Sequence, residues 1–290
     1  MQQISECGEF APLHNPAAVL GMEACKNVMP GKPMVAVFDT TFHQTMPKDK
    51  YIYPIPYEFY KKYGVRKYGA HGTSHKYVSR RINEILGRED TKIIVCHLGN
   101  GGSVSAVLNG KCIDTSMGFT PNAGVIMGSR CGDTDISILP YVMNITKMSA
   151  KEMDTIINKK SGLLGISGVS SDARDVEEGA KDGNKRCLLA LKMYNRRVIE
   201  YIAKYYVLLG GCDAICFTAG IGENAIGTRE EIMKGLEVLG VKVDEERNNV
   251  RGCEALLTKD SSKIPCYLIP TNEEVMIARD TYNLVLGNNV

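Results

Sequence analysis

Residues 92–113 read KIIVCHLGNGGSVSAVLNGKCI, and this stretch decides the fold. Two apolar runs, at residues 92–97 and 103–108, flank a glycine-rich turn, and Asn109-Gly110 leads into a third run at residues 111–113. Apolar, β-branched runs separated by such turns predict strands that are joined as hairpins. The stretch therefore predicts three antiparallel strands, with a glycine-rich turn at the end of the first one.

Further strands and helices alternate along the rest of the chain. Strands are predicted at residues 34–38, 213–218 and 266–269. One helix is predicted by an apolar stripe that Gly87 closes, and its residues are Val78, Ile82, Ile85 and Leu86. A long helix is predicted from about residue 184 to 208, with a buried face of Leu188, Leu191, Val198, Ile202 and Tyr206. Capping boxes at Ser149-x-x-Glu152, Thr228-x-x-Glu231 and Thr271-x-x-Glu274 predict three more helix starts. This alternation predicts an α/β protein, with a mixed sheet covered by helices on both faces.

Composition excludes several classes of protein. The 290 residues carry 35 Lys plus Arg and 33 Asp plus Glu, so the net charge of +2 argues against a nucleic-acid-binding surface. No apolar run is long enough to span a membrane, and the first residues do not resemble a signal peptide. The ten cysteines form no C-x-x-C pair, which favours reduced thiols in the cytoplasm over a zinc site or a disulfide framework.

Two glycine-rich segments follow predicted strands. The turn His97-Leu98-Gly99-Asn100-Gly101 suits phosphate oxygens, because glycine lets backbone N–H groups approach an anion closely. Taken alone it is more typical of a plain hairpin. Gly220-Ile221-Gly222-Glu223-Asn224 resembles the start of a dinucleotide-binding motif, but the third glycine is replaced by Ala225. Each signal alone is weak.

Charged residues and histidines also gather at strand ends and helix starts. His71 and His75 have the spacing of a zinc pair, but helix capping by Thr73 or Ser74 is the preferred interpretation. Arg130, between two glycines, suits a phosphoryl group. Carboxylates that suit Mg²⁺ are Asp39, Glu273 and Glu274, although such residues also serve as turn or first-turn helix residues. Together these parts indicate phosphoryl transfer.

At this point nine ordered segments resemble the acetokinase family, the short-chain carboxylate kinases of the acetate and sugar kinase/Hsc70/actin superfamily. They are APLHNPAAVLG (11–21), VFDTTFHQTMP (37–47), YGAHGTSHKYV (68–78), HLGNGGS (97–103), DTSMGFTP (114–121), MGSRCGDTD (127–135), SGVSSDARDV (167–176), FTAGIGENA (217–225) and IPTNEE (269–274). The resemblance implies an actin-like ATPase (ribonuclease H-like) fold and transfer of the γ-phosphoryl group of ATP to acetate. It also implies a Mg²⁺ or Mn²⁺ ion and a homodimer.

The resemblance also implies a role for each matching residue. Asp39, His71 and Arg130 would be catalytic. Asp39 would mainly position magnesium or water, because acetate is already ionised at pH 7 and needs no general base. Glu273 would help to bind the metal. Leu13, His14 and Pro121 would lie at the acyl pocket. The nucleotide would be bound by His97, Leu98, Gly99, Asn100, Gly101, Asp172, Ala173, Arg174, Gly220, Ile221, Gly222, Glu223 and Asn224.

Two departures from the family pattern are visible. The family begins with a further segment that this chain lacks, so residues 1–39 and 274–290 are expected to be remnants of a first domain. Residues 40–273 are then expected to be an intact second, nucleotide-binding domain, and the chain alone is expected to be a poor kinase. Ala70 stands where the family usually has Phe, which predicts either that a neighbouring side chain refills the gap or that the acyl pocket tolerates longer acyl chains. A propionate or butyrate kinase and an inactive nucleotide-binding fragment therefore remain as alternatives.

Overall fold

The computed structural model describes residues 1–6 and 15–287, and the chain divides into two compact units. One unit comprises Met1–Phe38 and Glu274–Val290, and the other comprises Asp39–Glu273. The first contains helices α1 (Gln2–Glu6) and α2 (Asn15–Val28) and most of α14 (Glu273–Val285). The second contains the sheet. The assignment of these units to the domains of the family stays a prediction.

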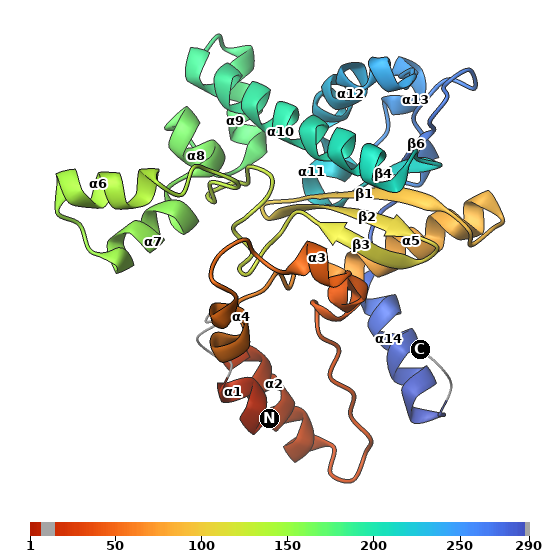
Figure 1. The fold of residues 1–290 in the computed structure, drawn as a ribbon. Helices are drawn as coiled ribbons and strands as arrows, with labels where there is room; N and C mark the ends of the chain where they lie inside the picture. The colour runs from red at the N-terminus through yellow and green to blue at the C-terminus, as the bar shows by residue number, and fades with distance from the viewer. Residues whose placement is uncertain (7–14, 288–290) are drawn as a thin grey trace. The chain divides into compact units, whose positions relative to one another are not determined.

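The sheet has six strands, and it is mixed as the sequence predicts (Figure 1). The strands are β1 (Lys92–Leu98), β2 (Gly102–Leu108), β3 (Lys111–Thr115), β4 (Ala214–Thr218), β5 (Ala255–Leu256) and β6 (Cys266–Leu268), in the order β3-β2-β1-β4-β6-β5. The pairs β1–β4 and β4–β6 are parallel, and the pairs β1–β2, β2–β3 and β5–β6 are antiparallel. The β2–β3 hairpin turns at Asn109 and Gly110, whose φ angles of 50° and 73° are those of a primed turn.

Helices cover both faces of the sheet, and alternate side chains of β1 therefore pack into two different cores. Ile94, Cys96 and Leu98 pack into the larger core with α10, and Ile93 and Val95 pack into the smaller core with α5. The helices of this unit are η1 (Thr41–Thr45), α3 (Lys48–Tyr51), α4 (Tyr57–Tyr63), α5 (Gly72–Leu86), α6 (Ile138–Thr146), α7 (Ala150–Lys159), α8 (Gly162–Ser167), α9 (Ala173–Lys181), α10 (Lys185–Leu209), α11 (Ala219–Asn224), α12 (Ile226–Gly235), η2 (Glu237–Leu239) and α13 (Glu245–Asn248). No described helix is long and apolar enough to cross a membrane.

Several local predictions are confirmed. α5 ends at Gly87, whose φ of 67° is left-handed, and α10 ends at Gly210. Ser149 caps α7 with the complete capping box. The nine cysteines that the structure describes are all free thiols.

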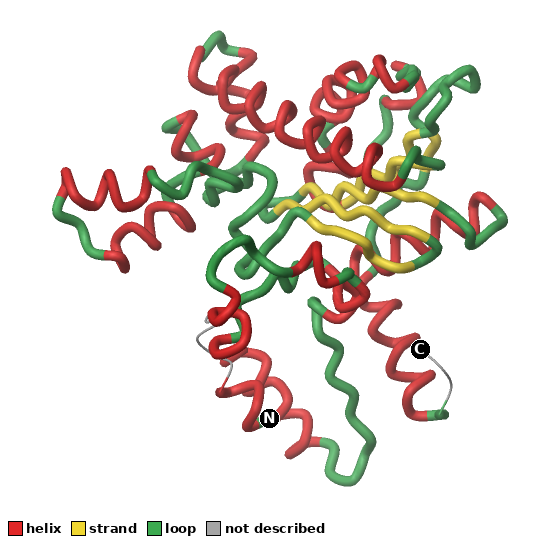
Figure 2. The backbone as a smooth tube through the Cα atoms, in the orientation of Figure 1, coloured by secondary structure: helices red, strands yellow, loops and turns green. Residues whose placement is uncertain are grey.

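Other local predictions are wrong. The strand predicted at residues 34–38 is loop, because it pairs with no strand in the described part of the chain (Figure 2). α12 begins at Ile226, so Thr228 lies inside it and its hydroxyl bonds Glu177. Thr271 likewise opens no helix, since its hydroxyl bonds Ser74 and α14 begins two residues later. On α10, Leu188 is half exposed, because the buried face is set by neighbours such as Cys187 and Ala190.

Candidate active site

The glycine-rich turn between β1 and β2 borders a pocket of about 780 Å³. Asn100, at the tip of the turn, forms part of its wall. Its backbone carbonyl accepts a hydrogen bond from the Gly128 N–H at 3.0 Å. A methyl group on Gly128 would lie 1.9 Å from the Asn100 side-chain oxygen and 2.6 Å from the Ser171 backbone carbonyl oxygen, and because that carbonyl is part of the backbone, only glycine fits here. The turn is therefore a hairpin, as the plainer interpretation holds, and it is also part of a cavity.

The other walls of the pocket come from α9 and α11. The lining residues are Asn100, Ser171, Asp172, Ala173, Arg174, Glu177, Gly220, Ile221, Asn224, Ala225 and Arg251. Both glycine-rich segments therefore line the same pocket, through Asn100 in one and through Gly220, Ile221 and Asn224 in the other. GIGEN, however, is not a loop before a helix, because it forms the short helix α11 itself. Glu177 and Arg251 were missed because no motif marks them, and Ser171 and Ala225 lie inside family segments but were given no role.

Asp172 and Arg174 are paired with each other at the edge of this pocket. Asp172 caps α9 by accepting from the Arg174 N–H at 2.9 Å, and its carboxylate also bonds the Arg174 guanidinium at 2.5 Å. These hydrogen bonds lower the pKa of Asp172 to about 2. The Arg174 side chain is 88% exposed, so it can leave this exposed partner at little cost when an anion binds.

Gly222 and Glu223 act behind the pocket wall instead of lining it. The Glu223 carboxylate accepts from the backbone N–H of Ala219 at 2.9 Å and of Thr271 at 3.2 Å. The Gly222 carbonyl accepts from Arg229, whose side chain is fully buried. Neither residue lines the pocket, and the nucleotide-binding role expected for them stays a prediction.

Asp39 is placed by backbone contacts and not by a strand. Its carboxylate accepts from the N–H of His71 at 2.6 Å and of Thr73 at 3.3 Å, which are among the unpaired donors at the start of α5. Its carbonyl accepts from the Gly72 N–H at 2.8 Å, and a methyl on Gly72 would lie 2.2 Å from that oxygen. Capping by Thr73 or Ser74 is thus wrong, because Asp39 caps the helix from a distant part of the sequence.

His71 and Arg130 both lie close to Gly101 in the glycine-rich turn. A methyl group placed on Gly101 would lie 3.4 Å from His71 Nε2 and 3.4 Å from Arg130 Nη1. Arg130 is held by its hydrogen bond to the Pro121 carbonyl at 3.0 Å, and burial lowers the pKa of its guanidinium. The structure therefore brings His71 and Arg130 to one turn, and Asp39 bonds the backbone at His71, although the three residues are far apart in the sequence.

The histidines of the site are held by buried hydroxyl groups. The His71 ring stacks on His97, with centroids 4.0 Å apart and planes at 17°. His71 Nδ1 and His75 Nε2 both lie within 2.8 Å of the Ser103 hydroxyl. His75 is thus a buried core histidine and not a polar loop residue, because the helix begins before it.

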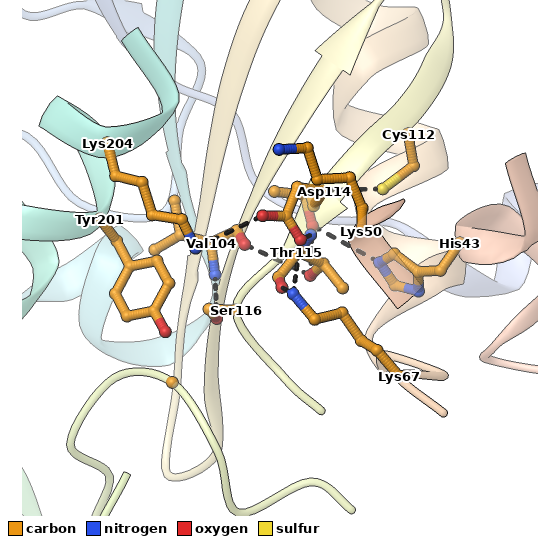
Figure 3. Close-up of polar contacts among 12 residues, drawn as sticks. His43, Lys50, Lys67, Val104, Cys112, Asp114, Thr115, Ser116, Tyr201 and Lys204 are labelled. Atoms are coloured by element: carbon orange, nitrogen blue, oxygen red, sulfur yellow. Dashed lines mark hydrogen bonds and ion pairs between the residues drawn. The ribbon is translucent and has the colours of Figure 1, made fainter. Parts of the chain in front are cut away.

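A buried ion pair, which the sequence did not reveal, holds the segment that leads to His71 (Figure 3). Asp114 on β3 is 3% exposed and accepts from Lys67 Nζ at 2.5 Å, with Lys204 Nζ at 3.4 Å. Lys67 also donates to the Thr115 carbonyl at 2.9 Å. This pair therefore ties residue 67 to the sheet four residues before His71.

The remaining predicted residues lie outside this arrangement or need a ligand. Leu13 and His14 lie outside the described residues. Glu273 is half-buried at the start of α14. Among residues 1–6 and 15–287, no three His, Cys, Asp or Glu side chains are grouped to hold a metal. A Mg²⁺ ion that arrives with ATP needs only one or two carboxylates besides phosphate and water, so the metal prediction does not depend on such a group.

A pocket that ends at a glycine-rich turn, beside an Arg and a His aimed at that turn, defines a phosphoryl-transfer class of site. Sequence similarity to known proteins identifies the family, because the Acetokinase family model matches residues 1–279. The acetate kinase of Treponema denticola is 58% identical over 287 residues, which cover 98% of this chain and 72% of that protein. The chain belongs to the acetokinase family.

Solved structures agree with this assignment. The crystal structure of Porphyromonas gingivalis acetate kinase matches with a TM-score of 0.94 and 46% identity, over 98% of this chain and 72% of that one. A propionate kinase from Francisella tularensis matches with a TM-score of 0.92 and 45% identity, over 97% and 72%. The fold is thus the actin-like ATPase fold.

Proposed function

We propose that this protein catalyses the reversible transfer of the γ-phosphoryl group of ATP to acetate, giving acetyl phosphate and ADP. One observation carries the assignment of the reacting centre: His71 Nε2 and Arg130 Nη1 each lie 3.4 Å from the same point above Gly101. Two donors that meet at a glycine-rich turn suit the charge of a phosphoryl group in transfer.

The reaction needs positioning more than proton transfer. A carboxylate oxygen of acetate forms a bond to the γ-phosphorus, the bond to the bridging oxygen breaks, and ADP leaves with that electron pair. Acetate is ionised at pH 7, so no proton has to be removed. Arg130 and His71 would donate to the oxygens of the transferring group, and the pocket beside Asn100 would hold the rest of ATP.

Magnesium would be held by Asp39 and Glu273. When bound, the ion would neutralise charge on the phosphate oxygens. Asp39 suits this role because it is exposed and each of its oxygens accepts only one backbone hydrogen bond, which leaves lone pairs available. Its two backbone contacts also fix the direction in which the carboxylate points.

The acceptor is the finer part of the proposal. Ala70, which directly precedes His71, is smaller than the Phe that the family usually has there, and this favours propionate or butyrate as second candidates. We also propose a homodimer, which light scattering on the purified protein would test. A nucleotide-binding protein without kinase activity is the third candidate, from a different class.

A hydroxamate assay separates these candidates. Purified protein is incubated with ATP and Mg²⁺ and with acetate, propionate or butyrate in turn, and the acyl phosphate is trapped by hydroxylamine. We expect product with acetate, and a loss of turnover in Arg130→Ala far larger than its change in KM for ATP. ATP binding without any acyl phosphate would contradict the kinase. Faster turnover of butyrate than of acetate would move the assignment to the longer acids.

A further inference from the structure

The Ser103 hydroxyl lies between two histidine rings. Its oxygen is 2.8 Å from His71 Nδ1 and 2.7 Å from His75 Nε2, and both Ser103 and His75 are fully buried. A hydroxyl group has a single proton, so it donates to one ring nitrogen and accepts an N–H from the other. The direction of this short chain of hydrogen bonds decides where the proton of each ring sits.

The other nitrogen of His75 decides the direction. His75 Nδ1 is buried and has no hydrogen-bond partner among the described residues. If Ser103 donated to His75 Nε2, neutral His75 would carry its proton on Nδ1, as a buried N–H without an acceptor. If His75 Nε2–H donates to Ser103 instead, Nδ1 carries only a lone pair without a partner. A buried acceptor without a partner is less rare than a buried N–H without one. Full burial also lowers the pKa of His75 well below its ordinary value, which keeps the ring neutral.

We propose that His75 and Ser103 are positioning residues that set the tautomer of His71. His75 Nε2–H donates to Ser103 Oγ, Ser103 O–H donates to His71 Nδ1, and the His71 ring proton therefore sits on Nε2. The consequence rests on the proposed function: Nε2 is the atom that faces Gly101 and Arg130, so the ring presents a donor to phosphoryl oxygens. The other tautomer would present a lone pair to an anion.

The stacked ring of His97 has the same arrangement. Thr271 Oγ1 donates to Ser74 Oγ at 2.8 Å, and Ser74 Oγ lies 2.8 Å from His97 Nδ1. With Thr271 as the donor, the Ser74 proton points to Nδ1, and the His97 proton also sits on Nε2. The hydroxyl groups of Ser103 and Ser74, on different elements, thus set the same tautomer in the stacked rings of His71 and His97.

Ring-nitrogen NMR tests the proposal without depending on turnover. The chain has only five histidines, so protein labelled with ¹⁵N-histidine gives a spectrum that single-histidine variants can assign. At neutral pH we expect His71 to carry its proton on Nε2 and His75 likewise. In Ser103→Ala, the His71 signals should shift towards a mixture of tautomers. A proton on Nδ1 of His71 in the unaltered protein, or an unchanged tautomer in Ser103→Ala, would overturn the proposal.

Ser105→Ala is the matched control. Ser105 is also fully buried on β2, two residues further along the same face, but its hydroxyl contacts His43 and Thr115. We expect this variant to leave both the His71 spectrum and kcat unchanged. Ser103→Ala should lower kcat about tenfold with little change in KM for ATP, the loss expected when one orienting hydrogen bond is removed. Equal kcat in both variants would contradict the proposal.

Substitution at His75 separates the hydrogen bond from packing. Gln can place an amide N–H near the position of Nε2, whereas Met fills similar volume without a donor. His75→Gln should therefore keep the His71 tautomer and most of kcat, and His75→Met should lose both. If the expected tautomer is found in a protein that makes no acyl phosphate, the proposed function fails while the assignment of the protons stands.

Discussion

Replacing Arg229 by Met should be among the most costly single changes in the unit that contains the sheet. The guanidinium is fully buried on α12 and donates four hydrogen bonds. Its acceptors are the Gly222 carbonyl at 2.9 Å, the Asn248 side-chain oxygen at 3.0 Å and its carbonyl at 2.8 Å, and the Val250 carbonyl at 2.7 Å. Burial, with a smaller contribution from Arg251, lowers the pKa of Arg229 to about 10, so the group stays charged at pH 7.

The size of the effect follows from the acceptors left behind. Each buried acceptor that loses its donor costs about 1 kcal/mol or more, so four of them predict a loss of about 4 kcal/mol of unfolding free energy. With a urea m-value of about 2–3 kcal/mol/M, the midpoint should fall by about 1–2 M. The urea midpoint of Arg229→Lys should lie between those of the unaltered protein and of Arg229→Met, because one ammonium group cannot reach the acceptors of all three partner residues.

The same change should weaken nucleotide binding. Arg229 joins the α11 backbone at Gly222 to the loop before Arg251, and both α11 and Arg251 line the pocket. We expect weaker ATP binding in calorimetry, measured well below the unfolding midpoint.

Arg81→Met is the control for this prediction. Arg81 pairs with Glu84 and Glu254 at the surface, and loss of such pairs costs under about 1 kcal/mol. If Arg229→Met lowers the midpoint no more than Arg81→Met, or leaves ATP binding intact, the reasoning about the buried guanidinium is refuted.

Three further outcomes are expected. Asp39→Asn should lower the unfolding free energy by less than about 1 kcal/mol, since Asn still caps α5, but it should reduce acyl phosphate formation strongly; unchanged activity would remove the carboxylate from the reaction. Burial lowers the pKa of His43 to about 4, so between pH 6.5 and 4 the unfolded chain binds a proton that the folded chain does not. As the pH decreases through this range, this group should lower the unfolding free energy by up to about 1.4 kcal/mol per pH unit. The urea midpoint of His43→Phe should therefore decrease less between pH 6.5 and 4 than that of the unaltered protein. Gly128→Ala should abolish ATP binding by its clash with the Ser171 backbone carbonyl and the Asn100 side chain, whereas Gly227→Ala, which meets no atom within 4 Å, should bind ATP normally.

The sequence by itself determined the local features of this protein. Apolar runs and the Asn109-Gly110 turn predicted the strands of the central hairpins, because strand periodicity and positive φ angles are properties of short segments. The glycines at the strand ends and the nine family segments led to the family and to most of the pocket wall. The strand prediction at residues 34–38 was wrong because a strand also needs a partner strand beside it, which a short segment does not encode.

Only the tertiary structure decided the contacts between distant segments. Asp39 was expected at a strand end, but it caps α5 because the turn before η1 approaches the start of that helix. Ser103 appeared only as part of a glycine-rich segment, and its place between two rings depends on how α5 packs against β2. No sequence motif marked Arg229, which lies fully buried on α12. Its burial follows from backbone carbonyls that a loop about 20 residues away directs towards it, and no local pattern encodes that geometry.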